Sequence, residues 1–162
     1  RTSISVSASG EQLRVNGDIE VGTTRAVKRH LQDHASITQV HLTSSGGNIF
    51  EARGLYRLFS SNGLDTHVDS LCASACTTAY VGGVTRTAGD DASFGFHQYR
   101  MDLPHAAIVT SAAEEQAADE ALFLEAGASP EFVSRMFDAR AEHMWWPSID
   151  YLQANGVVHA TR

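Results

Sequence analysis

The chain is poor in lysine, cysteine and proline, and it contains no long hydrophobic run. Its 162 residues include two cysteines and three prolines, and Lys28 is the single lysine. Two cysteines are too few for a scaffold held by disulfides, so the fold has to rest on a hydrophobic core, which a chain of this length can bury. No apolar run approaches the roughly 20 residues that cross a bilayer. Lys28 lies on the first predicted helix, far in sequence from any candidate nucleophile, which argues against a serine–lysine dyad.

Basic residues are outnumbered, and the net charge is −7. A nucleic-acid backbone is therefore an unsuitable partner. The hydrophobic fraction of 43% is that of an ordinary globular protein, and the length predicts one domain over residues 1–162. The first residue is Arg1 rather than methionine, which we interpret as a sign of processing or trimming.

The first hundred residues alternate between strand and helix patterns, which predicts an α/β fold with a layered, mostly parallel sheet and flanking helices. Val21 to Thr24 reads as a helix start with Thr23 or Thr24 as cap, and Asn62-Gly63 ends the second helix. Strands are expected at 3–7, 12–16, 37–42, 64–68, 84–87 and 93–96, and helices at about 23–33, 50–60 and 75–81.

After Pro104 the alternation of strand and helix patterns gives way to mainly helical patterns. Residues 111–126 form a strong helical pattern that ends at Gly127, and Ser129 and Pro130 open another helix. Ser148 caps a last helix, and a short strand is expected at 157–158. The segment from about 106 to 140 is predicted to form a protruding helical arm.

Three short segments carry residue types that nucleophilic catalysis needs: a hydroxyl, a base and donors for an oxyanion. The first is a diglycine turn, Gly46-Gly47, after an apolar strand. The second places Ser74 between small residues, just before a helix. The third ends a strand with His97. Each alone has an ordinary interpretation, namely a tight turn, a helix N-cap and a structural histidine. Their combination is more specific.

Together these segments resemble the proteolytic subunit of the Clp protease, within the wider ClpP/crotonase superfamily. The resemblance extends from about residue 13 to 158 and is closest to bacterial Clp-protease-like hypothetical proteins that carry Cys-x-Ser-Ala-Cys at the nucleophile. Three motifs carry it: an apolar strand followed by Ser-Ser-Gly-Gly (41–47), Ala-Ser-Ala (73–75) and Gly-Phe-His-Gln (95–98). A first strand with its Gly turn (13–20) and the closing segment (148–158) also resemble the family.

The resemblance implies a serine peptidase or related acyl-transfer hydrolase. Ser74 would be the nucleophile, His97 the base, and the backbone N–H groups of Gly47 and Ala75 the oxyanion hole. Ser45 stands where the family has proline. The resemblance further implies peptide or protein substrates, a homo-oligomer, and neither a metal nor an organic cofactor; any ATPase partner is left open.

The acid of the triad is not at its usual place. The family has an aspartate about four residues before the position of Ser148, and Met144 falls there. Glu142 is the nearest carboxylate and the first candidate to orient His97, Asp138 is the second, and a Ser–His dyad or an inactive site is the remaining alternative. Two alternative functions stay open. Met144 at the acid position favours a non-catalytic assembly module that kept the fold. A crotonase-like acyl-CoA enzyme is the other, and the joint presence of Ser74 and His97 disfavours it.

Cys72 and Cys76 flank Ser74, two residues on either side. Residues four apart at a strand-to-helix bend can meet the Cα separation of a disulfide, about 4.4–6.8 Å. Such a bridge would favour an extracytoplasmic, periplasmic location over the cytoplasm.

Two further clusters have simpler interpretations. His30 and His34 have metal-binding spacing, but the sequence lacks the glutamate of H-E-x-x-H, so a solvated helix face is expected. The acidic residues of the 111–126 helix are expected to form a solvated face, with a role in assembly as the alternative: Glu114, Glu115, Asp119 and Glu120. Apolar residues of the arm are expected to contact a second subunit: Phe123, Phe132, Val133 and Phe137.

Overall fold

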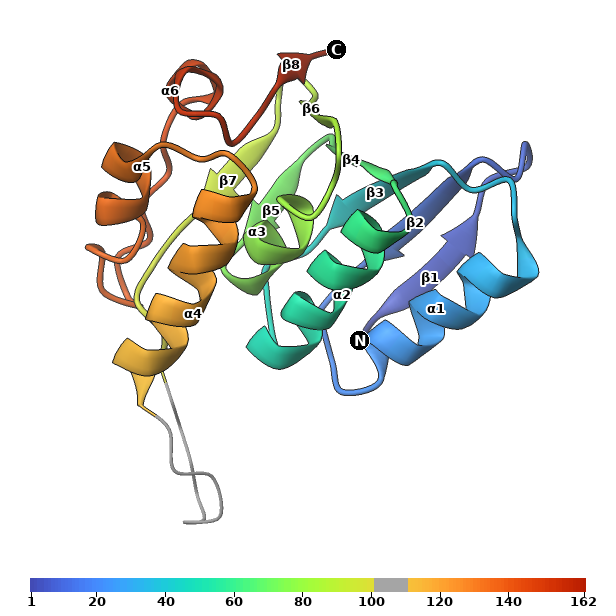
Figure 1. The fold of residues 1–162 in the computed structure, drawn as a ribbon, viewed down its shortest axis with the longest axis horizontal. Coiled ribbons are helices and arrows are strands. Elements are labelled where there is room, and N and C mark those ends of the chain that lie inside the picture. The colour runs from blue at the N-terminus through green and yellow to red at the C-terminus, as the bar shows by residue number, and fades with distance from the viewer. Residues whose placement is uncertain (101–110) are drawn as a thin grey trace.

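The computed structural model describes residues 1–100 and 111–162. A six-stranded sheet runs through it in the order β1-β2-β3-β4-β6-β8 (Figure 1). The first two strands are antiparallel and the other neighbours are parallel. Its strands are β1 (Ser3–Val6), β2 (Gln12–Asn16), β3 (Gln39–Thr43), β4 (Asp65–Val68), β6 (Arg86–Ala88) and β8 (Ala160–Thr161). The expected α/β fold with a mostly parallel sheet is confirmed.

A second, two-stranded sheet pairs β5 (Leu71–Ala73) with β7 (Ser93–Gly95) in parallel. It branches from the main sheet, because an isolated bridge joins Ser44, just after β3, to Cys72. Ser44 N–H donates to Leu71 O at 3.0 Å, and Ala73 N–H donates to Ser44 O at 3.0 Å. The end of β3 is therefore held next to β5.

The helices cover the sheet and close the far end of the molecule. In Figure 1, α1 and α2 lie across the front of the main sheet, and α4 to α6 gather at the end away from β1. One buried apolar cluster extends from β2 residues to Val157 and Val158. The helices are α1 (Thr23–Asp33), α2 (Ile49–Ser61), α3 (Ala75–Tyr80), α4 (Ala112–Glu125), α5 (Pro130–Arg135) and α6 (Ile149–Ala154). No described helix is long and apolar enough to cross a membrane.

The predicted caps of α5 and α6 are confirmed, and that of α1 is wrong. Ser129 and Ser148 accept hydrogen bonds from the first turns of α5 and α6, and Ser111 does the same for α4. The N-cap of α1 is Gly22 in the left-handed region, not a threonine. Glu51 of α2 accepts from the N–H groups of Gly22 and Thr24 at 2.9 and 2.8 Å. A distant carboxylate thus satisfies donors that the local sequence was expected to satisfy.

The expectation of a strand at 157–158 is wrong. Val157 and Val158 are buried, and both of their N–H groups donate to Leu152 O. The chain therefore folds back on α6 at this point. It reaches the sheet edge only at β8, where Thr87 pairs with Ala160 and Ala88 with Thr161.

The two expectations for residues of α4 and α5 also need correction. Asp119 is fully buried, and its Oδ1 accepts from Nε of Arg53 on α2 at 2.6 Å. Glu115 accepts from Nη1 of the same guanidinium at 2.5 Å, so these two residues of the acidic face are not solvated, whereas Glu114 is exposed. The residues expected to contact a second subunit are buried in the core of this chain or packed against it: Phe123, Phe132, Val133 and Phe137. The part of the expected arm at 106–110 lies outside the described residues.

Candidate active site

Ser74 lies at the junction of β5 and α3 in a strained backbone conformation. Its φ is 54° and its ψ −126°, and it is the one described non-glycine residue with positive φ. Such a conformation costs on the order of 1–3 kcal/mol and persists only where the surroundings impose it. Ser74 occupies the N-cap position of α3, but its side chain makes no cap hydrogen bond. Its Oγ has no hydrogen-bond partner among the described residues, so the N-cap interpretation does not account for this serine.

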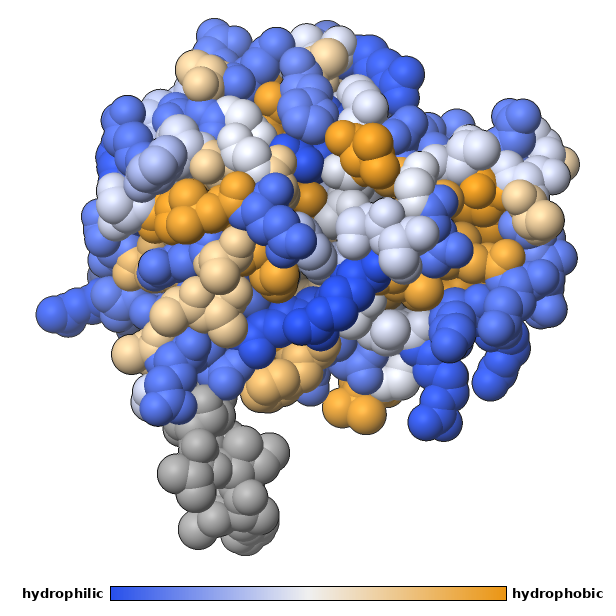
Figure 2. All heavy atoms as spheres, viewed as in Figure 1, coloured by the Kyte–Doolittle hydropathy of each residue, from blue (hydrophilic) through white to orange (hydrophobic). Residues whose placement is uncertain are grey.

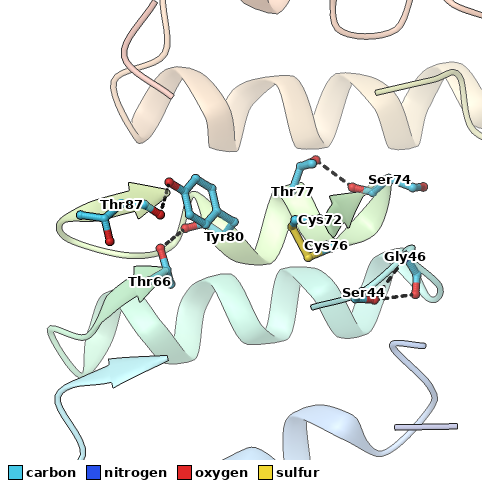
Figure 3. The surroundings of a disulfide bond; sticks show 9 residues. All are labelled: Ser44, Gly46, Thr66, Cys72, Ser74, Cys76, Thr77, Tyr80 and Thr87. Carbon is cyan, nitrogen blue, oxygen red and sulfur yellow. Dashed lines mark hydrogen bonds between the residues drawn. A yellow bond between two sulfur atoms is a disulfide. The ribbon is translucent and has the colours of Figure 1, made fainter. Parts of the chain in front are cut away.

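Neighbouring residues hold this conformation in place. The Ser74 N–H donates to Gly95 O at 2.8 Å, and the Thr77 hydroxyl donates to Ser74 O at 2.7 Å (Figure 3). Cys72 and Cys76 are joined by a disulfide whose Cα atoms are 5.3 Å apart, and both residues are fully buried. The bridge links the middle residue of β5 to the first turn of α3, with the serine between them.

The diglycine turn lies directly against Ser74. Gly46 has φ 119° and Gly47 φ 140°. A Cβ on Gly46 would lie 2.8 Å from Cβ of Ser74, and a Cβ on Gly47 would lie 2.3 Å from O of Ile19, which is closer than atoms can approach. Both positions therefore require glycine.

The turn keeps its shape without the proline that the resembling family has. Ser44 Oγ accepts from Gly46 N–H at 3.1 Å, and Ser45 Oγ donates to Asp18 Oδ1 at 3.4 Å. Ile19 N–H donates to Gly46 O at 2.8 Å, which ties the turn to the segment after β2. Side-chain and backbone hydrogen bonds thus restrict the conformation of the turn, as a proline would.

Two backbone donors near Ser74 remain without a partner among the described residues. Gly47 is exposed, and its N–H is not used in the bridge to Ile19, which runs through Gly46 O and Asn48 N–H. Ala75 is the first residue of α3, so its N–H has no acceptor within the helix. These are the two donors that the sequence predicts for an oxyanion hole.

His97 follows β7, at the same end of the small sheet as Ser74. Ala73 pairs with Gly95 in parallel, so the chain continues to Ser74 on one strand and to Phe96 and His97 on the other. The imidazole is partly buried, and Nδ1 lies 2.5 Å from Gln98 O. No hydrogen bond joins His97 to Ser74 Oγ in the structure. Catalytic hydrogen bonds are often long before substrate binds, so the geometry is compatible with a pair that closes later.

Neither candidate acid hydrogen-bonds to His97. Glu142 is exposed and pairs with the guanidinium of Arg100. Its pKa is lowered by its own backbone N–H and by Arg100. Asp138 contributes its backbone carbonyl, which accepts from Gln98 Nε2 at 3.5 Å. The role of Glu142 as the orienting acid stays a prediction without support from this arrangement.

Met144 lies beside the strand end that leads to His97. Phe96 and Trp145 form an isolated antiparallel bridge with hydrogen bonds of 2.9 and 2.8 Å, and His97 and Met144 are the residues that flank it on one side. The Met144 thioether packs on Gly95, where a Cβ would come within 2.2 Å of Sδ. A thioether, and not a carboxylate, therefore stands at this strand end.

A buried polar cluster fixes the segment just after His97. The hydroxyl of Tyr99 donates to Asp119, which also binds Arg53, and Tyr99 N–H donates to Gln116 at 3.0 Å. Burial, followed by the charge of Asp119, raises the pKa of Tyr99 well above its ordinary value, so the phenol stays protonated and a donor. The spacing of Glu115 and Asp119 on one helical face was the signal in the sequence that could have indicated this cluster.

Comparison with known proteins places the fold. No family model matches the chain, and no curated protein matches it. Among solved structures, ClpP1 from Listeria monocytogenes is similar, with a TM-score of 0.74, 19% identity and coverage of 95% of this chain and 92% of that one. A point mutant of the same protein has a TM-score of 0.71 and 20% identity, with the same coverage.

A third structure is the membrane-bound stomatin-specific protease 1510-N, in a mutant form. Its TM-score is 0.69 at 13% identity, over 92% of this chain and 77% of that one. Identities this low establish a shared fold and not a shared activity. The chain has the fold of the ClpP-like serine peptidases, and Ser74 and His97 lie at the ends of its paired strands β5 and β7.

Proposed function

We propose that this protein is a serine peptidase, or a closely related acyl-transfer hydrolase, that acts through Ser74. The observation that carries the proposal is the strained backbone of Ser74 beside Gly46 and Gly47. A serine held at positive φ between a strand and a helix presents its hydroxyl outward, as in other hydrolases with a nucleophile at such a turn. The ClpP-like fold supports a peptide or protein substrate.

The proposed reaction has two halves. Ser74 Oγ attacks the scissile carbonyl carbon while Nε2 of His97 takes the hydroxyl proton, and the N–H groups of Gly47 and Ala75 bind the resulting oxyanion. The C–N bond then breaks, and His97 donates the proton to the leaving amine. Water, deprotonated by His97, attacks the acyl-enzyme, and the proton returns to Ser74 as the acid product leaves.

The hydrogen bond at Nδ1 of His97 suits this role. A backbone carbonyl can only accept, so the 2.5 Å contact with Gln98 O requires the proton on Nδ1. The lone pair then lies on Nε2, which is the atom that must take the proton from serine. A neutral carbonyl fixes the tautomer but stabilises the imidazolium less than a carboxylate would, so we propose a Ser–His dyad of modest activity.

A hollow lined by Trp145 and Ala139, whose backbone groups pair with Phe96 and Gln98, is the proposed place for part of the substrate. It measures about 370 Å³. The guanidinium of Arg135, which also lines it, lies over the ring of Trp145, 4.8 Å from its centroid. The lining residues are Arg135, Asp138, Ala139, His143, Met144 and Trp145.

Labelling with a fluorophosphonate probe tests the proposal directly. The probe phosphorylates an activated serine, and mass spectrometry of the digested protein locates the adduct. We expect a single adduct on the peptide that contains Ser74. An adduct on a different serine would contradict the assignment. Complete absence of labelling in folded protein would favour the second candidate, a non-catalytic module that kept the fold, for which the lack of a carboxylate hydrogen-bonded to His97 is the supporting observation.

The disulfide is expected to matter for both stability and activity. Replacing both Cys72 and Cys76 with alanine should lower the free energy of unfolding by about 2 kcal/mol, the chain-entropy value for so small a loop. It should also slow labelling of Ser74, because α3 and β5 are then free to relax the strained serine. Urea unfolding and labelling rates check the two effects. Equal labelling rates in the variant and the parent would show that the bridge does not position the serine.

We also propose an extracytoplasmic location, which the disulfide supports because such bonds persist in oxidising compartments. Thiol counting on protein taken from its native compartment and denatured without reduction tests this. No free thiols are expected; two would overturn the proposal and leave the role of Ser74 untouched.

Self-association is a further expected property. Val21 and Phe50, at the N-terminal ends of α1 and α2, are 84% and 47% exposed. In Figure 2 the face of the molecule that carries α1 and α2 is mostly polar, with apolar side chains in separate groups. We propose a homo-oligomer that covers some of these exposed side chains. Sedimentation velocity should show a species larger than the monomer, and a monomer at tens of micromolar would refute the proposal.

A further inference from the structure

A row of polar side chains crosses four strands of the main sheet. The parallel register pairs Arg14 with His41, His41 with His67, and His67 with Thr87. Val40 and Leu42, on either side of His41, are buried in the core. Because side chains alternate along a strand, His41 points to the face opposite that core. No step of the proposed peptidase reaction uses these residues.

Asp69 joins the two histidines just after the end of β4. Its Oδ1 lies 2.8 Å from Nε2 of His67, and its Oδ2 lies 3.7 Å from Nδ1 of His41. The imidazole rings are 4.7 Å apart between centroids. One ligand atom from each of the three residues can be chosen so that all lie within 4.8 Å of one another.

The nitrogen of each histidine that points away from Asp69 is already held by an oxygen. Nε2 of His41 lies 2.8 Å from Oε1 of Gln39, and Nδ1 of His67 lies 2.7 Å from Oγ1 of Thr87. Histidines that bind metals are oriented in this way, with the second ring nitrogen donating to a protein oxygen. A carboxylate only accepts, so the 2.8 Å contact with Oδ1 of Asp69 places a proton on Nε2 of His67 in this structure, and a bound ion would take the place of that proton.

We propose that His41, His67 and Asp69 form a binding site for a divalent transition metal ion, with Zn²⁺ as the expected occupant. Two ligand atoms of a tetrahedral zinc site lie roughly 3.4 Å apart, given bonds of about 2.1 Å. The separations of 2.8 and 3.7 Å run to the two oxygens of Asp69, and one ligand atom from each residue lies within 4.8 Å of the others, so binding requires the side chains to draw together around the ion. Two histidines and one carboxylate match the nitrogen and oxygen donors that this class of ion prefers.

The surroundings leave room for the ion and for a water as fourth ligand. A hollow of about 280 Å³ borders the histidines, and the Asp69 side chain is 70% exposed. Gln12, Gln39 and Arg162 line the rest of the hollow. Arg14 and Arg162 add positive charge nearby, which weakens binding of a cation and predicts moderate rather than tight affinity. Once bound, the ion would join β3, β4 and the connection to β5.

Calorimetric titration of Zn²⁺ into chelator-treated, tag-free protein tests the site. We expect one Zn²⁺ per chain. The variant Asp69→Asn changes an exposed side chain and should weaken binding by at least about 10-fold, since a ligand matters no less than its supporting residues. Bound Co²⁺ should give visible absorption bands of a four- or five-coordinate site, and these should be lost in the variant.

His30 and His34 supply the matched control, because their i, i+4 spacing on α1 can also capture zinc at a surface. The double variant His30→Ala/His34→Ala should bind one Zn²⁺ as the parent does. The proposal is overturned if Asp69→Asn binds like the parent, if the α1 variant loses the ion, or if the parent binds none. If Asp69→Asn fails to fold, His41→Asn takes its place with the same expected loss.

Discussion

The variant Ser74→Ala is expected to abolish both fluorophosphonate labelling and peptide hydrolysis. Loss of the nucleophile in a well-studied serine protease lowers kcat by roughly 10⁶, which reduces activity to background. The effect should be this large here because the described residues near Gly47 and Ala75 offer no second hydroxyl in a comparable conformation. Labelling stoichiometry by intact-mass spectrometry and hydrolysis of a fluorogenic peptide library measure the two losses.

The control for this variant is Ser70→Ala, which removes an exposed serine four residues earlier. It should leave labelling and hydrolysis at the level of the parent. Alanine at position 74 carries the same positive φ as serine, so the free energy of unfolding should change by no more than about 0.5 kcal/mol. Labelling that survives Ser74→Ala would end the assignment.

The variant Met144→Asp is expected to raise hydrolysis. Met144 and His97 flank the Phe96–Trp145 bridge on one side, so we expect a carboxylate at position 144 to approach the imidazole and stabilise its charged form. In a serine protease triad, replacing the acid by its amide costs about 10⁴ in kcat, which sets the upper limit of the gain. Because aspartate is shorter than methionine and the hydrogen bond that His97 Nδ1 donates to Gln98 O has to break, we expect a gain nearer 10²-fold, measured as kcat/KM.

Two controls separate a charge effect from a change of packing. Met144→Asn has the same shape without the charge and should give little or no gain. Glu142→Gln should leave activity unchanged, because Glu142 pairs with Arg100 and makes no hydrogen bond to His97. A Met144→Asp variant no faster than Met144→Asn would show that no acid can act from this position. A large loss in Glu142→Gln would instead restore Glu142 as the orienting acid.

Much of the fold follows from local signals in the sequence. Strand and helix patterns place β2, β4 and α2 within a residue or two, and the start of α5, because glycine turns and serine caps act on their immediate neighbours. The predictions from the sequence are wrong where a residue far away in the chain determines the local structure. Glu51 caps α1 from another helix, and Val157 and Val158 turn into the core before the chain reaches the sheet. Asp119 is buried because Arg53 and Tyr99 reach it from elsewhere in the chain.

In the candidate site, too, some features follow from local sequence and others depend on the tertiary structure. Ser74, His97, Gly47 and Ala75 can be read from short motifs, since residues at the ends of neighbouring parallel strands meet at one edge. The strained φ of Ser74, the partners of His97 and Glu142, and the meeting of His41 with His67 and Asp69 depend on strand register and side-chain packing. Those contacts join residues far apart in the chain, where the sequence pattern has no periodicity to reveal them, so only the tertiary structure decides them.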